Sequence, residues 1–98
     1  MKTYFVSRHA GAIDWASLNG FNSVEVVSHF DPSVVADGDK VIGILPIHLA
    51  AVVCERGGEY FHLTMDIPAD ARGRELTAKE MFSYGASVRR FHVAEITE

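Results

Sequence analysis

Short apolar segments that alternate with helical segments constrain the fold of this chain more than any other feature. Segments rich in β-branched and aromatic residues predict strands, and amphipathic or apolar runs between them predict three helices. The predicted strands are 3–6, 24–30, 41–45, 60–65 and 88–96, and the predicted helices are 12–19, 46–56 and 77–84. This order, βαββαβαβ, is typical of a single α/β domain over 1–98, with a mainly parallel five-stranded sheet and helices on its faces.

The boundaries of the predicted helices depend on a few residues. Gly20, Gly57 and Gly85 follow the three helices and supply natural stops. Pro46 suits the first turn of the second helix, because its missing N–H would be unpaired there in any case. Thr77, with an acidic residue three positions later, is a capping-box pattern that starts the third helix.

The link between the second and third strands is the weak point of this topology. It begins with the turn sequence Asp31-Pro32-Ser33 and has room for about one helical turn, which is short for a parallel crossover. Either one of the two strands runs antiparallel to the rest of the sheet, or the link is a minimal one.

Composition narrows the class of protein. At 48% hydrophobic and 22% charged, the composition is typical of a soluble globular protein. No apolar run approaches the ~20 residues of a membrane span. The first residues lead directly into a predicted strand rather than into a secretory signal peptide. A lone Cys54 fits a reducing cytoplasm and excludes an intrachain disulfide framework. A net charge of −4 argues against binding duplex nucleic acid, but a small anionic ligand needs only a few local cations.

Three of the five histidines, His9, His29 and His48, lie at or just beyond the ends of predicted strands, where open α/β sheets bind their ligands. The first, His9, comes after Ser7 and Arg8, so a hydroxyl, a guanidinium and an imidazole share one turn. Arginine matches phosphate oxygens, and histidine transfers protons near neutral pH. Ala10 and Gly11 would let the backbone approach an anion at the helix start. The alternative is a surface turn in which Arg8 pairs with Asp14.

The other histidines have fewer neighbouring groups that could act on a ligand. His48 lies at the start of the second helix, beside Pro46, where the helix dipole favours anions; packing of its ring on an aromatic residue is the alternative. His29 is better explained by a turn hydrogen bond, and His62 and His92 by structural roles within strands.

Arg72 and Arg74 flank a glycine in the loop after the fourth strand. They are candidates for anion contacts, and the alternative is a solvated loop whose cations pair with Asp70 or Glu75. The histidines have no close-spaced pairing, so we predict neither a metal site nor a cofactor.

Six consecutive apolar residues, 49–54, make the second helix unusually hydrophobic. Such a helix should be covered on most sides, either by the sheet or by another subunit.

Four ordered blocks of the chain resemble one family. They are Ser7-Arg8-His9-Ala10-Gly11-Ala12 with Trp15, Gly38-Asp39 before Val41-Ile42-Gly43, Leu45-Pro46-Ile47-His48-Leu49-Ala50, and Arg72-Gly73-Arg74-Glu75-Leu76-Thr77. The family is the VVA-type group of small CRISPR-associated (Csx-type) accessory proteins encoded beside type III systems. The resemblance covers nearly the whole chain. It implies a Rossmann-like three-layer fold related to domains that sense cyclic oligoadenylates.

The resemblance further implies a cytoplasmic ring nuclease that opens cyclic tetra-adenylate and so switches off an antiviral signal. In a metal-independent reaction the ribose 2′-OH attacks its own 3′-phosphate. We then expect Arg8 to contact the phosphate, His9 or His48 to transfer the proton, and Ser7 with the start of the second helix to hold a neighbouring phosphate.

A symmetric ring of four nucleotides suits a two-fold dimer. The apolar second helix, with Phe82, Tyr84 and Phe91, is the expected dimer face. Two other functions stay open: a sponge that binds the ring without cutting it, and a structural adaptor of the effector complex.

Overall fold

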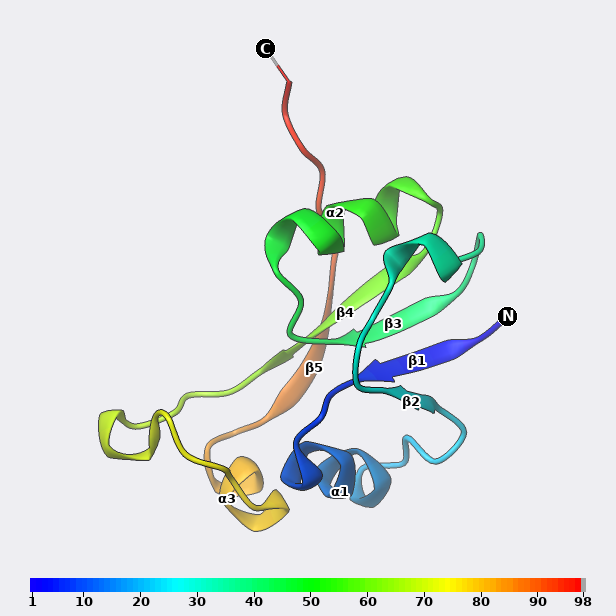
Figure 1. Ribbon diagram of the computed structural model, residues 1–98. Helices are drawn as coiled ribbons and strands as arrows, with labels where there is room; N and C mark the ends of the chain where they lie inside the picture. The colour runs from blue at the N-terminus through cyan, green and yellow to red at the C-terminus, as the bar shows by residue number, and fades with distance from the viewer. Residues whose placement is uncertain (98) are drawn as a thin grey trace.

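The computed structural model describes residues 1–97 and has helices on both faces of one sheet (Figure 1). Along the chain the strands are β1 (Thr3–Val6), β2 (Glu25–Val27), β3 (Lys40–Gly43), β4 (Glu59–Thr64) and β5 (Ser87–Phe91). The α-helices are α1 (Ala10–Leu18), α2 (Ile47–Glu55) and α3 (Ala78–Ser83), and two 3₁₀ turns are η1 (Pro32–Val34) and η2 (Ala69–Ala71).

The strand order across the sheet is β2-β1-β3-β4-β5. β1 pairs in parallel with β2 and β3, so that Phe5 lies between Val26 and Ile42, and β4 continues the parallel run beside β3. Only β5, at the edge, is antiparallel to its neighbour. The predicted α/β class, with a mainly parallel five-stranded sheet and three helices, is therefore confirmed.

The short link between β2 and β3 is a minimal parallel crossover, and neither of these strands runs antiparallel to its neighbour. β2 and β3 lie on opposite sides of β1 and both run parallel to it, so the link crosses over β1. It packs there through Phe30, whose ring lies 6.0 Å from that of Tyr4, and through fully buried Val35. The turn begins at Asp31, whose carboxylate accepts a hydrogen bond from the Ser33 N–H at 3.0 Å.

Alternation along the strands divides the core into two layers. Tyr4, Val41 and Tyr60 face α2 and the crossing link, and Ala50 and Val53 of α2 pack on them. Phe5, Ile42 and Leu63 point to the opposite face, which α1 and α3 cover. This second layer is completed by Ala12, Trp15 and Ala16 of α1 and by Met81 of α3.

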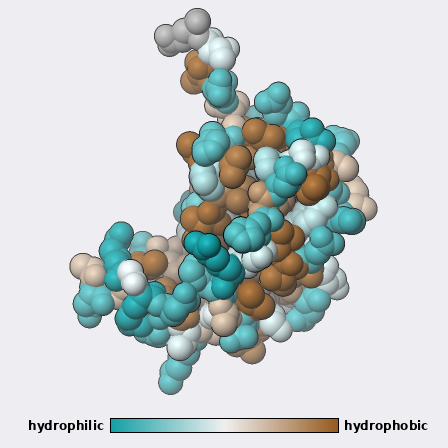
Figure 2. All heavy atoms as spheres, in the orientation of Figure 1, coloured by the Kyte–Doolittle hydropathy of each residue, from teal (hydrophilic) through white to brown (hydrophobic). Residues whose placement is uncertain are grey.

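The expectation that α2 is covered on most sides is met in part by the single chain. Ala50 and Val53 are buried and the other residues of the apolar run 49–54 are half-buried, whereas Ile47, which precedes this run, is 76% exposed. Apolar atoms consequently lie at the surface around α2 (Figure 2).

The proposed dimer face does not form one surface. Phe91 pairs with Tyr60 and lies on the α2 face of the sheet, whereas Phe82 and Tyr84 belong to α3 and its C-terminal cap on the other face.

Three strands are shorter than predicted, β3 by one residue and β2 and β5 by four each. β2 covers only 25–27, because beyond Val27 the chain leaves its partner β1 to cross the sheet. β5 ends at Phe91 rather than at 96, because β4 begins at Glu59 and provides no partner beyond that point. The observed helix starts lie closer to the predicted ones. Thr77 forms the predicted capping box with Glu80, and α1 begins only two residues before the predicted start.

Within residues 1–97, no helix combines the length and the apolar content needed to cross a membrane.

Candidate functional site

A cavity of about 450 Å³ opens at the carboxyl edge of the parallel strands. It lies where the chain leaves β1 toward one face of the sheet and β3 toward the other, which is the usual ligand position in open α/β sheets. Its size is within the roughly 300–1,000 Å³ of small-molecule sites. The lining residues are Val6, Ser7, Arg8, His9, Ala12, Ser28, Gly43, Ile44, Leu63, Met65, Ile67, Arg74, Glu75, Leu76 and Met81.

The lining divides into an apolar floor and a polar rim. The floor comes from the ends of β1 and β4 and from α3, with Leu63 and Met81 almost fully buried. The rim combines the Ser7–His9 turn with the loop that carries Arg74 and Glu75. An apolar floor with a few convergent polar groups is the arrangement that binds and orients a small ligand.

His9 and Glu75 form the central contact of the rim. The Nδ1 of His9 lies 2.8 Å from Oε1 and 3.1 Å from Oε2 of Glu75, although the residues are 66 positions apart. Because a carboxylate only accepts hydrogen bonds, Nδ1 carries the proton, and Nε2 is left for a ligand. Both side chains are more than half exposed, so a ligand can reach them.

The turn before α1 positions this histidine. His9 is the N-cap residue of α1, and its backbone N–H donates to the Ser7 hydroxyl oxygen at 3.1 Å. The hydroxyl hydrogen of Ser7 stays available for a further acceptor. Arg8 is exposed at the rim, and among the described residues no carboxylate, Asp14 included, lies within ion-pair distance of it. A guanidinium without a protein partner is suited to an anionic ligand.

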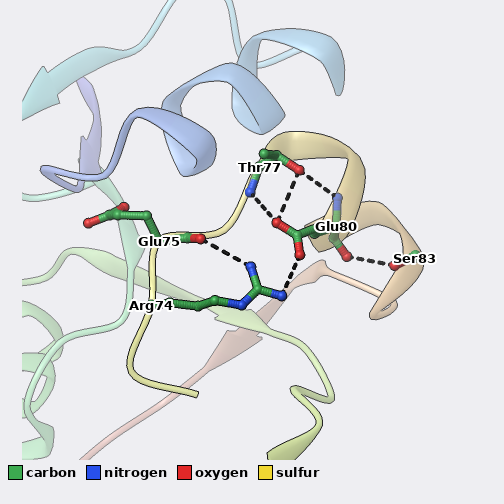
Figure 3. Close-up of polar contacts among 5 residues, drawn as sticks. All are labelled: Arg74, Glu75, Thr77, Glu80 and Ser83. Atoms are coloured by element: carbon green, nitrogen blue, oxygen red, sulfur yellow. Dashed lines mark hydrogen bonds and ion pairs between the residues drawn. The ribbon is translucent and has the colours of Figure 1, made fainter. Parts of the chain in front are cut away.

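Arg74 holds the loop rather than standing free. Its Nη2 lies 2.6 Å from Oε2 of Glu80, and its Nη1 donates to the Glu75 carbonyl oxygen at 3.4 Å (Figure 3). The predicted alternative partner, the Glu75 carboxylate, is instead bound to His9. Arg74 thus lines the cavity while fixing the backbone that carries Glu75.

Glu80 is the anchor of this arrangement. Its carboxylate also accepts from the Thr77 N–H, and the Thr77 hydroxyl accepts from the Glu80 N–H, which closes the capping box of α3 (Figure 3). The hydrogen bond from Arg74, followed by that from the Thr77 backbone, lowers the pKa of Glu80 to about 2. The same contact raises the pKa of Arg74.

Gly11 has a packing role. A Cβ at this position would lie 1.8 Å from the carbonyl oxygen of Leu76, so α1 and the loop before α3 approach closely only because Gly11 has no side chain. Neither Gly11 nor Ala10 lines the cavity, although Ala10 is exposed as the first residue of α1. The backbone of Gly11 is thus covered by Leu76, whereas that of Ala10 is exposed outside the cavity lining.

The remaining predicted site residues lie outside the cavity lining. Pro46 caps the N-terminus of α2 and His48 is exposed in its first turn, on the face of the sheet opposite α1. Arg72 is the exposed residue after η2, and it does not line the cavity either. The cavity lining therefore includes Ser7, Arg8, His9 and Arg74 but not Pro46, His48 and Arg72.

The third strand's contribution to the site comes from its backbone. Gly43 and Ile44 line the cavity, and buried Tyr60 fixes this segment, because its hydroxyl lies 3.0 Å from the Leu45 nitrogen and 3.2 Å from the Gly43 oxygen. His62 also contacts this hydroxyl through Nδ1 at 2.6 Å, which accounts for its structural role. Burial raises the pKa of Tyr60.

Glu75 is the residue that the sequence did not single out as functional. It appeared there as a possible partner of the loop arginines and as part of a block that resembles the family, because no local pattern links it to a histidine 66 positions away.

No group of three or more His, Cys, Asp or Glu side chains that could hold a metal ion occurs within the described 1–97.

One comparison with known proteins gives a match. The model of a family described as "Putative CRISPR-associated protein (Cas_VVA1548)" matches residues 4–94. No curated protein and no solved structure matches the chain.

Proposed function

Because the chain belongs to this family of CRISPR-associated proteins, we propose that it is a cytoplasmic ring nuclease of type III antiviral signalling. Its substrate is cyclic tetra-adenylate, and it needs no metal ion. The observation that carries the proposal is the His9–Glu75 pair at the mouth of a cavity whose rim also holds Arg8. A base oriented by a carboxylate, next to a cation, is what intramolecular phosphodiester cleavage requires.

In the proposed reaction the ribose 2′-oxygen attacks the adjacent 3′-phosphorus. Nε2 of His9 takes the 2′-hydroxyl proton, while Glu75 holds the ring and stabilises the charge that the ring acquires. The P–O5′ bond breaks, and the 5′-oxygen takes a proton from water at the open rim. The resulting hydroxide takes the proton from His9, so a 2′,3′-cyclic phosphate and neutral His9 remain. Arg8 stabilises the negative charge on the non-bridging phosphate oxygens during this step.

The volume of the cavity favours a substrate that is shared between two copies of the chain. A volume of about 450 Å³ holds a nucleotide portion of the ring rather than four nucleotides. We therefore propose that a second copy contacts the rest of the ring, as the symmetry of the ligand favours.

One observation favours a second function, the binding of the ring without cleavage. His9 is the single imidazole on the cavity lining, so no second histidine is present there to protonate the leaving oxygen. A protein with this rim could act as a sponge for the cyclic nucleotide. An adaptor role in the effector complex would instead predict no binding of the ring at all.

Incubation of the purified protein with cyclic tetra-adenylate and EDTA, followed by liquid chromatography with mass detection, tests the proposal. Linear products that end in a 2′,3′-cyclic phosphate are expected. An intact ring would overturn metal-independent cleavage, and a binding measurement on the same sample would then separate the sponge from the adaptor.

Two variants assign the reaction to the cavity. His9→Ala should lower the cleavage rate by roughly 10²–10⁴-fold while the ring still binds, since a positioned base contributes about that much. His48→Ala is the matched control, because His48 lies outside the cavity lining and its removal should leave turnover unchanged. Equal loss in both variants would contradict the assignment of the base.

A further inference from the structure

The chain beyond β5 forms an arm that leaves the body of the domain. Residues 92–97 continue past α2 and away from the rest of the chain (Figure 1). The arm includes Ile96, which is 85% exposed, and it follows Phe91, which is 42% exposed. Ile96 also belongs to the segment that the sequence predicts as strand, so the arm has strand-forming residues but no partner strand within the described chain.

The outer edge of β5, the strand from which the arm continues, has no neighbouring strand within the described residues. β5 is the last strand of the sheet and pairs on one side only, with β4. The Phe91 carbonyl and the Val93 N–H both turn inward to Cys54 of α2, the latter at 3.4 Å. By strand alternation, the backbone groups of Val88 and Arg90 face outward, and those of residues 92, 94 and 96 would follow once the arm continues as a strand. Such an edge is a template for another strand.

We propose that two copies of this chain pair through this edge and arm, antiparallel over residues 87–97, about a two-fold axis at His92. The proposal does not depend on the proposed ligand. In this register each Arg89 lies opposite Glu95 of the second copy, on the same face of the joined sheet. Phe91 lies opposite Val93, and Val88 opposite Ile96, so apolar residues meet apolar residues.

Neighbouring registers are less favourable. Pairing of β5 with β5 about Arg89 would place that arginine opposite itself, and like charges directly opposite are destabilising. An axis at Phe91 places Arg90 opposite His92, and an axis at Val93 places Phe91 opposite Glu95. Only the axis at His92 pairs opposite charges and apolar residues at the same time.

The arm extends from the end of the sheet opposite the cavity. β5 runs antiparallel to β4, so its C-terminal end lies where the parallel strands begin, whereas the cavity lies where they end. Pairing would add on the order of ten backbone hydrogen bonds and cover Phe91 and Ile96. It would leave the cavity of each copy open, so the copy that contacts the rest of the ring in the proposed function would associate through a different surface, at the cavity end of the sheet.

The charge pair gives a direct test by sedimentation equilibrium in low salt, without nucleotide. The unmodified chain should form a dimer whose population rises with concentration. Arg89→Glu and Glu95→Arg should each weaken it by roughly tenfold, because each places like charges opposite one another twice. The double variant exchanges the two charges and should restore association to within about threefold of the original.

A chain that stays monomeric at millimolar concentration would overturn the proposal. So would a dimer that neither single variant weakens, since its contact would lie elsewhere. Circular dichroism of each variant shows whether the fold is kept, and the double variant guards against a loss of association caused by misfolding.

A cysteine cross-link tests the register. In a Cys54→Ser background, His92→Cys should oxidise to a disulfide-linked dimer, because directly opposed residues lie within the ~4.4–6.8 Å Cα separation that a disulfide spans. Ala94→Cys in the same background is the control, since residue 94 lies opposite residue 90 and not opposite itself. Equal cross-linking at both positions, or cross-linking only at 94, would exclude the axis at His92.

Discussion

At the scale of single residues, the candidate site depends on how a few polar groups divide their hydrogen bonds. The Glu75 carboxylate is hydrogen-bonded to His9. The Arg74 guanidinium is paired with Glu80 and donates a hydrogen bond to the loop backbone. Arg8 and the Nε2 of His9 remain for a ligand. The residues that hold the rim are thus distinct from those that can contact what binds there.

Replacement of Glu75 by Gln should separate these two roles. The ring of His9 would lose its charged partner, so we expect cleavage of cyclic tetra-adenylate to slow by about 10²-fold with little change in binding. Asp70→Asn removes the same charge from the same loop without touching the cavity lining and should have no effect. Measured single-turnover rates and binding constants decide this; a parallel loss of affinity would mean that Glu75 contacts the ligand.

Gly11→Ala tests the close approach of α1 to the loop that carries Glu75. The new Cβ would meet the Leu76 carbonyl, so the loop must move, and we expect a loss of about 1–3 kcal/mol in the free energy of unfolding. Urea titration measures it. Ala10→Ser, at the exposed neighbouring position, should cost no more than about 0.5 kcal/mol. Equal effects at the two positions would refute the packing role of Gly11.

At the scale of elements, α3 and the preceding loop act together through Glu80. The helix has only six residues, so its capping box and its contact with Arg74 matter more than helix propensity. Because Glu75 precedes Thr77 by two residues, any loosening of this cap should also disturb the rim of the cavity.

Acid titration of stability tests this anchor. The pKa of Glu80 is lowered from 4.5 to about 2 in the folded chain, so its contribution is complete above about pH 4.5 and is lost as the pH falls toward 2. We expect urea midpoints to fall over this range, and to fall less in Glu80→Gln, which has no carboxylate to protonate. An identical slope in both proteins would show that the ion pair does not stabilise the fold.

At the scale of the whole molecule, stability is concentrated in the middle of the sheet. β1 and β3 have neighbours on both sides and supply fully buried Phe5 and Val41. β2 has three residues, lies at an edge, and exposes Val26. The two layers of the core therefore meet at β1 and β3 rather than at the edges.

Hydrogen exchange should follow this distribution. We expect the amides of β1, β3 and β4 that bond within the sheet to exchange most slowly, and those of β2 and 92–97 to exchange fastest at low protein concentration. Mass spectrometry of peptic peptides resolves these segments. Protection of β2 equal to that of β1 would contradict a core centred on the inner strands.

Local patterns predict much of this architecture. Strand and helix order, the glycine stops and the capping box at Thr77 all depend on neighbours in the chain, and each is present in the structure. The strand-end rule also places Ser7, Arg8 and His9 correctly, because the carboxyl ends of parallel strands share one edge.

The sequence by itself therefore determined the α/β class and one half of the candidate site. Only the tertiary structure decided that Glu75 faces His9, because that contact closes a loop of 66 positions and needs the cap of α3 and the bare backbone of Gly11. It also decided that His48 lies outside the cavity lining, because α1 and α2 cover opposite faces of the sheet. The tertiary structure also decided the lengths of the strands, since a strand extends only as far as a neighbouring strand provides hydrogen-bond partners.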